Sequence, residues 1–201
     1  LQNTAQFTVP EFKENRQRCQ RLMGGNYPGD CLLAGDEVPA GQLQYIVIGD
    51  SRGGALAAGW IAAHHPNPFL SLGQGGCLPL LGVERFTTEG AMHCQNTYGP
   101  AFDLLQQHRP SNATVFLVGR FAAYVNGTGF GDLKAEQVKP GHLHVQAVGP
   151  RIEKTEGLYP DTFRQGLLNT LAAISGQVKN VVIVLQVPEL GFDPKSCVAR
   201  P

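Results

Sequence analysis

The sequence predicts a single α/β domain built on a central, mainly parallel sheet. The chain has 201 residues, which suffices for one domain with a real core and is too short for two. Three short apolar segments rich in β-branched residues have the features of buried strands, and segments with helical features lie between them. This alternation is typical of a parallel sheet with right-handed crossovers.

The predicted strands are residues 43–48, 114–118 and 180–187. Their nearly continuous apolar character indicates burial on both faces of the sheet. The predicted helices are residues 54–63, 100–108 and 161–174. In the third helix, four apolar residues recur at helical spacing and form a stripe that can cover a sheet: Phe163, Leu167, Leu168 and Leu171.

Two stretches contain no predicted element. Residues 1–42 lack sustained periodicity and are predicted to form an N-terminal extension or linker, so that the domain proper covers residues 43–201. The stretch from Asn126 to Leu158 is rich in glycine. Structureless loops of that length are uncommon unless they have a function, and we expect this one to be functional.

The charge is balanced, with 16 acidic and 16 basic side chains. No global field therefore attracts nucleic acid or an anionic membrane, and we expect no nucleic-acid partner. No apolar run approaches the roughly 20 residues that span a bilayer, and residues 1–14 lack the basic start and apolar centre of a signal peptide. We expect a soluble chain, which could be an excised piece of a longer protein.

Five cysteines indicate the compartment. Cys19 and Cys31 bracket one irregular stretch, and Cys77 and Cys94 bracket another; a disulfide can close loops of both lengths. These four cysteines permit three pairings, and two short-range bridges are the simplest. Such bridges indicate an oxidising compartment. Cys197 would then need a partner on a missing or neighbouring segment. A metal site is disfavoured because there is no CxxC or close His/Cys cluster.

Gly49, Asp50 and Ser51 follow the first predicted strand directly and precede a helix rich in Gly and Ala. A hydroxyl here lies beyond the carboxyl end of a parallel strand, where open α/β sheets bind ligands, and beside the unpaired amides of a helix N-terminus. Such amides can stabilise an oxyanion. A serine becomes a strong nucleophile only when a base can take its proton. The structural alternative is that Ser51 caps the helix and Asp50 favours the turn.

Nucleotide binding is another reading of this glycine-containing turn. Residues 49–54 have neither the spacing of a GxGxxG fingerprint nor a Walker lysine. We therefore expect no nucleotide and no other cofactor.

Residues 45–59 resemble the first block of the SGNH, or GDSL-like, hydrolases, whose nucleophile is the serine of Gly-Asp-Ser. Further segments, in the same order, are similar to the SGNH domains fused to membrane acyltransferases of acyltransferase family 3: residues 76–80, Cys94, residues 118–124, 187–189 and 192–194, and Cys197. Those proteins acetylate bacterial surface polysaccharides. The resemblance implies a three-layer, flavodoxin-like SGNH fold, located in the periplasm and tethered to the inner membrane by a fused acyltransferase domain.

The family's first two blocks assign roles to two residues. Ser51 would be the nucleophile and its backbone amide one oxyanion donor. Gly76 would be the second-block glycine, whose amide also faces the oxyanion; Gly75 fits less well because it does not directly precede Cys77. Preorganised donors of this kind contribute a few kcal/mol each to the transition state. The alternative for Gly76 is a flexible turn beside a disulfide.

The third block departs from the family pattern. Ordinary members have Gly-x-Asn-Asp after this strand, whereas residues 119–122 read Gly-Arg-Phe-Ala, so the side-chain amide donor is missing. Arg120 could supply a charge-assisted donor or contact an anionic substrate group, or it could form an ion pair at the strand end. Asn126 could turn back into the site, although residues 126–129 have the composition of a turn.

The fourth block, a catalytic Asp-x-x-His near the C-terminus, is not found before Pro201. All histidines occur earlier: His64, His65, His93, His108, His142 and His144. Only the last two lie in a loop that could reach the site, and a base must come within hydrogen-bond distance of Ser51. We expect the catalytic Asp and His on residues absent from this chain.

The resemblance implies O-acetyl transfer, in which Ser51 takes an acetyl group from an acyl donor and passes it to a carbohydrate hydroxyl. In a carbohydrate esterase, water would attack the same intermediate. A non-catalytic module that binds glycan or scaffolds a membrane partner is a second alternative, favoured by Phe121 and the missing histidine. The stretch from Asn126 to Leu158 is a candidate lid over a glycan. Three aromatic residues are candidates for sugar stacking, although aromatic residues near strand and helix ends more often serve in packing: Tyr124, Phe130 and Tyr159.

Overall fold

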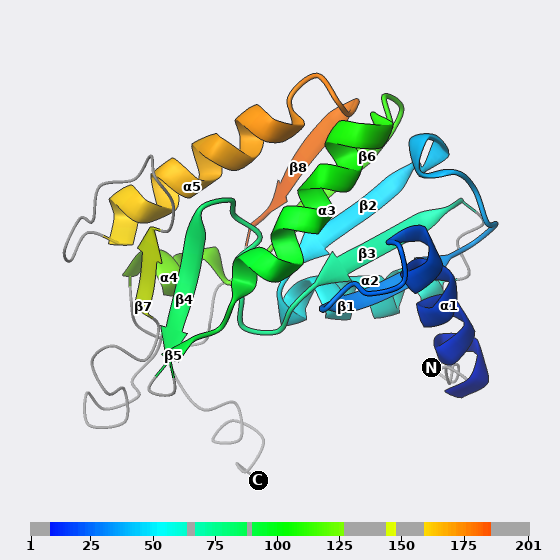
Figure 1. The fold of residues 1–201 in the computed structure, drawn as a ribbon, viewed down its shortest axis with the longest axis horizontal. Helices are drawn as coiled ribbons and strands as arrows, with labels where there is room; N and C mark the ends of the chain where they lie inside the picture. The colour runs from blue at the N-terminus through cyan, green and yellow to red at the C-terminus, as the bar shows by residue number, and fades with distance from the viewer. Residues whose placement is uncertain (1–8, 64–66, 88–89, 127–143, 148–158, 186–201) are drawn as a thin grey trace, which may run out of the picture.

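The computed structural model describes residues 9–63, 67–87, 90–126, 144–147 and 159–185. A sheet with strand order β1-β3-β2-β6-β8 forms its centre (Figure 1). These strands are β1 (Asp30–Ala34), β2 (Tyr45–Gly49), β3 (Phe69–Gly73), β6 (Thr114–Val118) and β8 (Asn180–Val184). The last four are parallel, and β1 pairs antiparallel with β3 at one edge. The predicted α/β fold with a mainly parallel sheet is confirmed.

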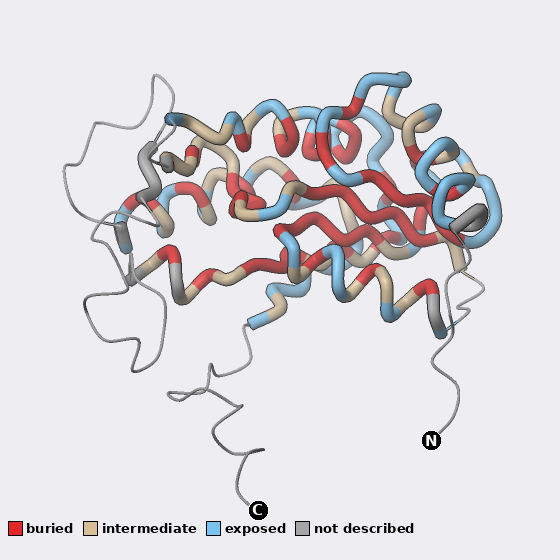
Figure 2. The backbone as a smooth tube through the Cα atoms, turned by 90° about the horizontal axis from the view of Figure 1, so that it is seen from below, coloured by how far each residue is buried: buried red, intermediate tan, exposed pale blue. Residues whose placement is uncertain are grey.

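Helices cover both faces of this sheet and complete three layers. Helix α2 (Ser51–Ala62) covers one face, and α3 (Cys94–His108) and α5 (Tyr159–Ile174) cover the other. Strand residues alternate between two cores: Val47 of β2 packs in the core beneath α2, and Ile46 and Ile48 pack in the core that includes α3 and α5. Figure 2 shows the buried residues concentrated along the central strands and the inner sides of the helices.

The predicted extension contributes to the main sheet. The sequence predicts no element before residue 43, whereas α1 (Val9–Leu22) and β1 both form there. Strand β1 is a run of only five residues, and α1 has few apolar residues, so neither has a clear hydrophobic period. Their pairing and packing with the rest of the domain, including the disulfide between Cys19 and Cys31, stabilise both.

A small second sheet lies beside the main one, with strand order β5-β4-β7. It consists of β4 (Val83–Thr87), β5 (Gly90–Ala91) and β7 (His144–Ala147), all antiparallel. Strand β7 corrects the prediction that residues 126–158 contain no element. It is only four residues long, and its pairing with β4, some 60 positions earlier in the chain, is not visible in a local pattern. The short helices η1 (Ala40–Gln42) and α4 (Phe121–Asn126) complete the described elements.

Two helices begin earlier than predicted because carboxylates cap them. Helix α2 begins at Ser51 instead of residue 54, since Asp50 accepts a hydrogen bond from the amide of Arg52. Helix α3 begins at Cys94 instead of residue 100, since Glu84 from β4 accepts a hydrogen bond of 2.8 Å from the amide of Cys94. The second cap comes from a distant strand, so the local sequence around residue 94 does not reveal it.

Both predicted disulfides are confirmed. Cys19 pairs with Cys31 and Cys77 with Cys94, with Cα atoms 5.6 and 5.5 Å apart. Cys197 lies outside the described residues. Within the described ranges, no helix has the length and apolar character to cross a bilayer, and no three His, Cys, Asp or Glu side chains cluster as metal ligands would.

Candidate active site

Three loops leave the carboxyl ends of neighbouring parallel strands, at the same end of the sheet. The first loop follows β2, the second follows β3 and the third follows β6. Gly49, the last residue of β2, pairs with Gly73 of β3 on one side and with Val118 of β6 on the other. Since neighbouring strands lie about 4.8 Å apart, the loops that follow them converge. The order β3-β2-β6-β8 reads 2-1-3-4 in chain order. The connections that follow β2 and β6 therefore run to opposite sides. The place between these two strands is the switch point of the sheet, and doubly wound sheets bind their ligands there.

Glycines allow the backbones of β2, β3 and β6 to approach closely at the carboxyl ends of these strands. A Cβ atom on Gly73 would meet the carbonyl oxygen of Gly49, and one on Gly49 would meet the carbonyl oxygen of Val118. Any larger residue at either position would push the strand ends apart. The strand ends that position the three loops are therefore fixed by backbone contact.

Asp50 connects the first and third loops. Its carboxylate is buried, with 3% of the residue exposed. Oδ1 accepts a hydrogen bond of 2.8 Å from the amide of Arg52, and Oδ2 accepts one of 2.9 Å from the amide of Arg120. Asp50 therefore caps α2, and the capping role considered for Ser51 belongs to its neighbour.

Ser51 is the first residue of α2 and is exposed. Its hydroxyl makes no hydrogen bond with any residue in the described part of the chain. It lies at the N-terminal end of the helix, which carries the positive end of the helix dipole. There the amides of Arg52 and Gly54 donate to Asp50. The amides of Ser51 and Gly53 have no acceptor among the described residues. An exposed hydroxyl at this point is well placed to attack an acyl carbon whose oxygen those amides would stabilise.

The loop after β3 holds Gly76 in a conformation that favours glycine. Its φ is +78°, and the amide of Cys77 donates to the carbonyl of Gln74 at 3.1 Å, which closes a turn of type II geometry. The carbonyl oxygen of Gly76 accepts hydrogen bonds from the hydroxyl of Tyr124 (2.6 Å) and from Nη1 of Arg85 (2.8 Å). The amide of Gly76 has no acceptor among the described residues and remains available to an oxyanion.

Helix α3 fixes the same loop from the other side. The disulfide joins Cys77 to Cys94 at the start of the helix. The hydroxyl of Thr97 donates to Oε1 of Gln74 at 2.6 Å. The hydroxyl of Tyr98 lies 2.8 Å from the carbonyl oxygen of Cys77 and 3.0 Å from that of Gly49, both acceptors. Tyr98 thus ties the end of β2 to the loop after β3.

Replacing Tyr98 with phenylalanine should destabilise the domain and reduce its sensitivity to alkali. Burial is the main cause that raises the pKa of Tyr98 well above its ordinary value. The folded state therefore holds this proton more tightly than the unfolded state. The resulting stabilisation is complete below about pH 10, the ordinary tyrosine value, and is lost as the pH rises toward the folded pKa.

For Tyr98→Phe we expect the free energy of unfolding near neutral pH to fall by about 1–3 kcal/mol, because the buried carbonyl of Cys77 loses its donor. Urea unfolding followed by circular dichroism at about pH 7 and about pH 11 measures this loss and its pH dependence. The fall in stability with pH should become smaller, although burial also raises the pKa values of Tyr27 and Tyr124. An unchanged fall would contradict the assignment to Tyr98.

The third loop contains no side-chain amide at the position where the wider family has asparagine. Phe121 stands there and is buried, with its ring 5.7 Å from that of Phe163 in an edge-to-face contact. The side chain of Arg120 is half-buried, and its backbone amide is held by Asp50. Asn126 is the last residue of α4, and its side chain lies outside the described part of the structure.

Of the two roles considered for Tyr124, sugar stacking is wrong and packing is confirmed. Tyr124 is 2% exposed, its hydroxyl donates to Gly76, and Arg85 lies 5.8 Å from the ring centroid. Its role is to support the loop of Gly76. Phe130 and the side chain of Tyr159 lie outside the described residues.

The remaining supports of the site were not predicted. Arg85 comes from β4, Tyr98 from α3 and Glu84 from β4, and none belongs to a motif that the sequence reveals. Their hydrogen bonds go mostly to backbone atoms. Such partners depend on where the loops lie and leave no pattern in the local sequence.

The structure places two histidine side chains. His93 precedes α3 and is exposed, and His108 ends α3 and is also exposed. Neither forms a hydrogen bond with Ser51. His64, His65 and His142 lie outside the described residues, and His144 is described only as a backbone position in β7.

The fold and the site together define a flavodoxin-like α/β domain with an exposed serine at the switch point of its sheet. Residues 16–201 match the sequence model of the SGNH domain that is fused to AT3 domains. The chain belongs to this family, whose members are fused to AT3 (acyltransferase 3) membrane domains. No curated protein and no solved structure matches the chain.

Proposed function

We propose that the chain is the periplasmic SGNH domain of an O-acyltransferase that transfers an acetyl group, through an ester on Ser51, to a hydroxyl of a surface carbohydrate such as O-antigen. The observation that carries this proposal is the exposed hydroxyl of Ser51 at the start of α2, which has no hydrogen-bond partner among the described residues. It lies beside the loop that fixes Gly76. A fused AT3 domain anchors the protein in the inner membrane, and the two disulfides suit the oxidising periplasm.

The reaction consists of two half-reactions. In the first, Oγ of Ser51 bonds to the acetyl carbon, the bond from that carbon to the donor's leaving atom breaks, and the serine proton passes to a base. In the second, an acceptor hydroxyl gives up its proton and bonds to the acetyl carbon, while Oγ of Ser51 leaves and regains a proton. The amides of Ser51 and Gly76 stabilise the negative oxygen in both steps. The base lies outside the described residues.

Arg120 would assist as a charged donor in place of the missing asparagine, or would contact an anionic group of the substrate. Its position directly after β6 and its link to Asp50 support a role at the site. Asn126 would act as a further donor at the site if its side chain reaches back from the end of α4.

Two other functions use the same site. In a carbohydrate esterase, water would replace the acceptor hydroxyl in the second half-reaction. A non-catalytic glycan-binding module is favoured by one observation: Phe121 is buried in the core at the position of the family's asparagine.

Covalent labelling tests whether Ser51 is an activated nucleophile. The full-length protein is treated with a biotinylated fluorophosphonate, digested, and analysed by mass spectrometry. Because this probe reacts with activated serines, we expect one adduct on the peptide that contains Ser51 and none in heat-denatured protein. Absence of an adduct, or an adduct only on other residues, would support the glycan-binding module instead.

A further inference from the structure

A small cavity opens along helix α2 at the β1 edge of the main sheet. It has a volume of about 200 Å³ and lies between α1, β1, β3 and α2. We call it the edge pocket, and the residues that matter to the argument are Phe12, Arg16, Asp30, Gly54, Ala58 and Ser71. It is smaller than the roughly 300–1,000 Å³ of pockets for drug-sized ligands, which suits one small chemical group.

The edge pocket lies along the face of α2 that carries the proposed nucleophile. Residues three, four and seven positions apart share one side of a helix. Ser51, Gly54 and Ala58 have this spacing, and the last two line the pocket. Asp30 begins β1, and its register partner is Gly73 at the carboxyl end of β3. The pocket therefore reaches the same end of the sheet as Ser51.

Ser71 places a polar group in the pocket, on the sheet side. Ser71 lies in the middle of β3, between Leu32 of β1 and Val47 of β2. It is 7% exposed, and its hydroxyl forms no hydrogen bond with any described residue. Its Oγ is not among the fully enclosed side-chain atoms that lack a partner, so solvent reaches it through the cavity that Ser71 lines. A bound ligand can therefore replace water as the hydrogen-bond partner of this hydroxyl.

The rest of the lining combines charge with apolar surface. Arg16 and Asp30 contribute opposite charges, and neither side chain is in an ion pair or hydrogen bond with another described residue. Phe12 is 45% exposed and Ala58 adds apolar wall. A sugar ring presents hydroxyls at its edge and C–H bonds on its face, so it complements both kinds of surface.

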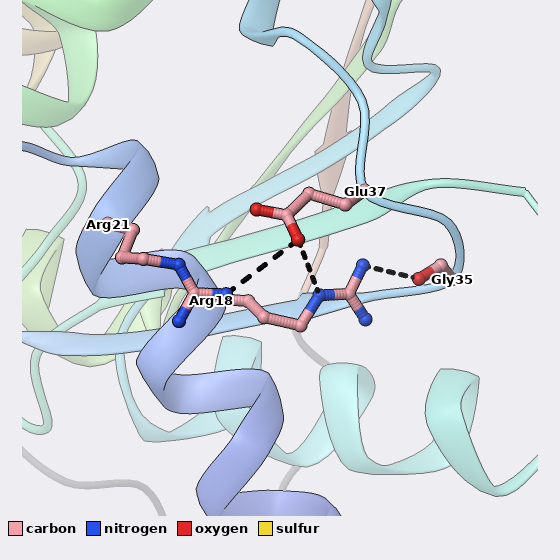
Figure 3. A network of polar contacts seen from close by, with 4 residues as sticks. All are labelled: Arg18, Arg21, Gly35 and Glu37. Atoms are coloured by element: carbon pink, nitrogen blue, oxygen red, sulfur yellow. Dashed lines mark hydrogen bonds and ion pairs between the residues drawn. The ribbon is translucent and has the colours of Figure 1, made fainter.

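The wall formed by α1 is held in place. The disulfide between Cys19 and Cys31 joins α1 to β1. Figure 3 shows a second connection, in which Nη2 of Arg18 donates to the carbonyl of Gly35 at 2.7 Å and Glu37 lies 3.8 Å from Nε of Arg18. The pocket is thus built before a ligand arrives, which lowers the entropic cost of binding.

We propose that the edge pocket binds one sugar residue of the acceptor glycan and holds a neighbouring hydroxyl beside Ser51. The identity of the ligand rests on the proposed function, whereas the existence of a binding site rests on the cavity and on Ser71. The carboxylate of Asp30 accepts hydrogen bonds from sugar hydroxyls, the hydroxyl of Ser71 donates one to a sugar oxygen, and the ring packs on Phe12. The charged groups at the pocket make it a poor site for the acyl chain of a donor.

Ligand binding is tested on the full-length Ser51→Ala protein in lipid nanodiscs, which cannot form the ester. Saturation-transfer NMR measures binding of a panel of methyl glycosides of glucose, galactose, mannose and rhamnose. At least one should bind, and Asp30→Asn and Ser71→Ala should each weaken its affinity about tenfold or more. The matched controls Asp103→Asn on α3 and Ser175→Ala after α5, both exposed, should bind as the parent does.

The same pocket variants with Ser51 intact should retain fluorophosphonate labelling, which separates this proposal from the proposed nucleophile. The proposal is overturned if no glycoside binds, or if binding is unchanged in Asp30→Asn and Ser71→Ala. It is also overturned if Ser71→Ala changes only the preference for p-nitrophenyl hexanoate over the acetate, because the pocket would then hold an acyl chain. If labelling is lost while glycoside binding is retained, the result would count against Ser51 as the nucleophile and not against the edge pocket.

Discussion

Replacing Ser51 with alanine is expected to reduce the rate of p-nitrophenyl acetate hydrolysis and of acetyl transfer by about 1,000-fold or more. A nucleophile takes part in every turnover, and losses of this size are typical when one is removed from a serine-dependent site. Stability should change little, because Ser51 is exposed and Asp50 caps the helix. Steady-state kinetics of the full-length protein, with thermal unfolding of both forms, measures the two effects separately.

Ser111→Ala is the matched control for this change. Ser111 is exposed in the turn just before β6. It therefore lies near the amino ends of the parallel strands, whereas Ser51 lies at their carboxyl ends. Ser111→Ala should leave both rates unchanged. If Ser51→Ala retained wild-type rates while remaining folded, the covalent mechanism would be wrong and any activity would belong to another group.

Gly76→Ala is expected to reduce the same rates by about 100-fold, the usual cost of losing one oxyanion donor. Gly76 has a φ of +78°, which costs a residue with a Cβ about 1–2 kcal/mol. The new methyl group would also meet Nη1 of Arg85 and lie 3.3 Å from Cε of Met92. Arg85 could move aside only by giving up its hydrogen bond to the Gly76 carbonyl, so the loop and its free amide would shift.

The adjacent glycine provides a close control. A Cβ on Gly75 would meet no atom within 4 Å, and Gly75 is not among the residues with positive φ. Gly75→Ala should therefore be nearly neutral in rate and stability. Equal losses in both variants, measured by the same kinetics and by thermal unfolding, would mean that the turn as a whole matters and that Gly76 has no particular role.

The elements that could be predicted are those whose residues carry their own pattern. Strands β2, β6 and β8 are continuous apolar runs, and α5 has an apolar stripe. The predicted burial on both faces is wrong for β8, whose residues are half-buried or exposed, because β8 lies at the edge of the sheet and pairs only with β6. Strand β1 and strand β7 could not be predicted, because each is short and exists through pairing with a strand that lies far away in the chain. The early starts of α2 and α3 likewise depend on the carboxylates that cap them.

The sequence alone determined the class of fold, both disulfides, and the location of the candidate nucleophile after a buried strand and before a helix. These features follow from local chemistry: apolar runs, nearby cysteine pairs and the Gly-Asp-Ser turn. Only the tertiary structure decided that Asp50 joins two loops, that Tyr98, Tyr124 and Arg85 hold the backbone around Gly76, and that a pocket opens along α2. Those features depend on backbone atoms and side chains brought together from distant elements, and no local pattern in the sequence encodes such meetings.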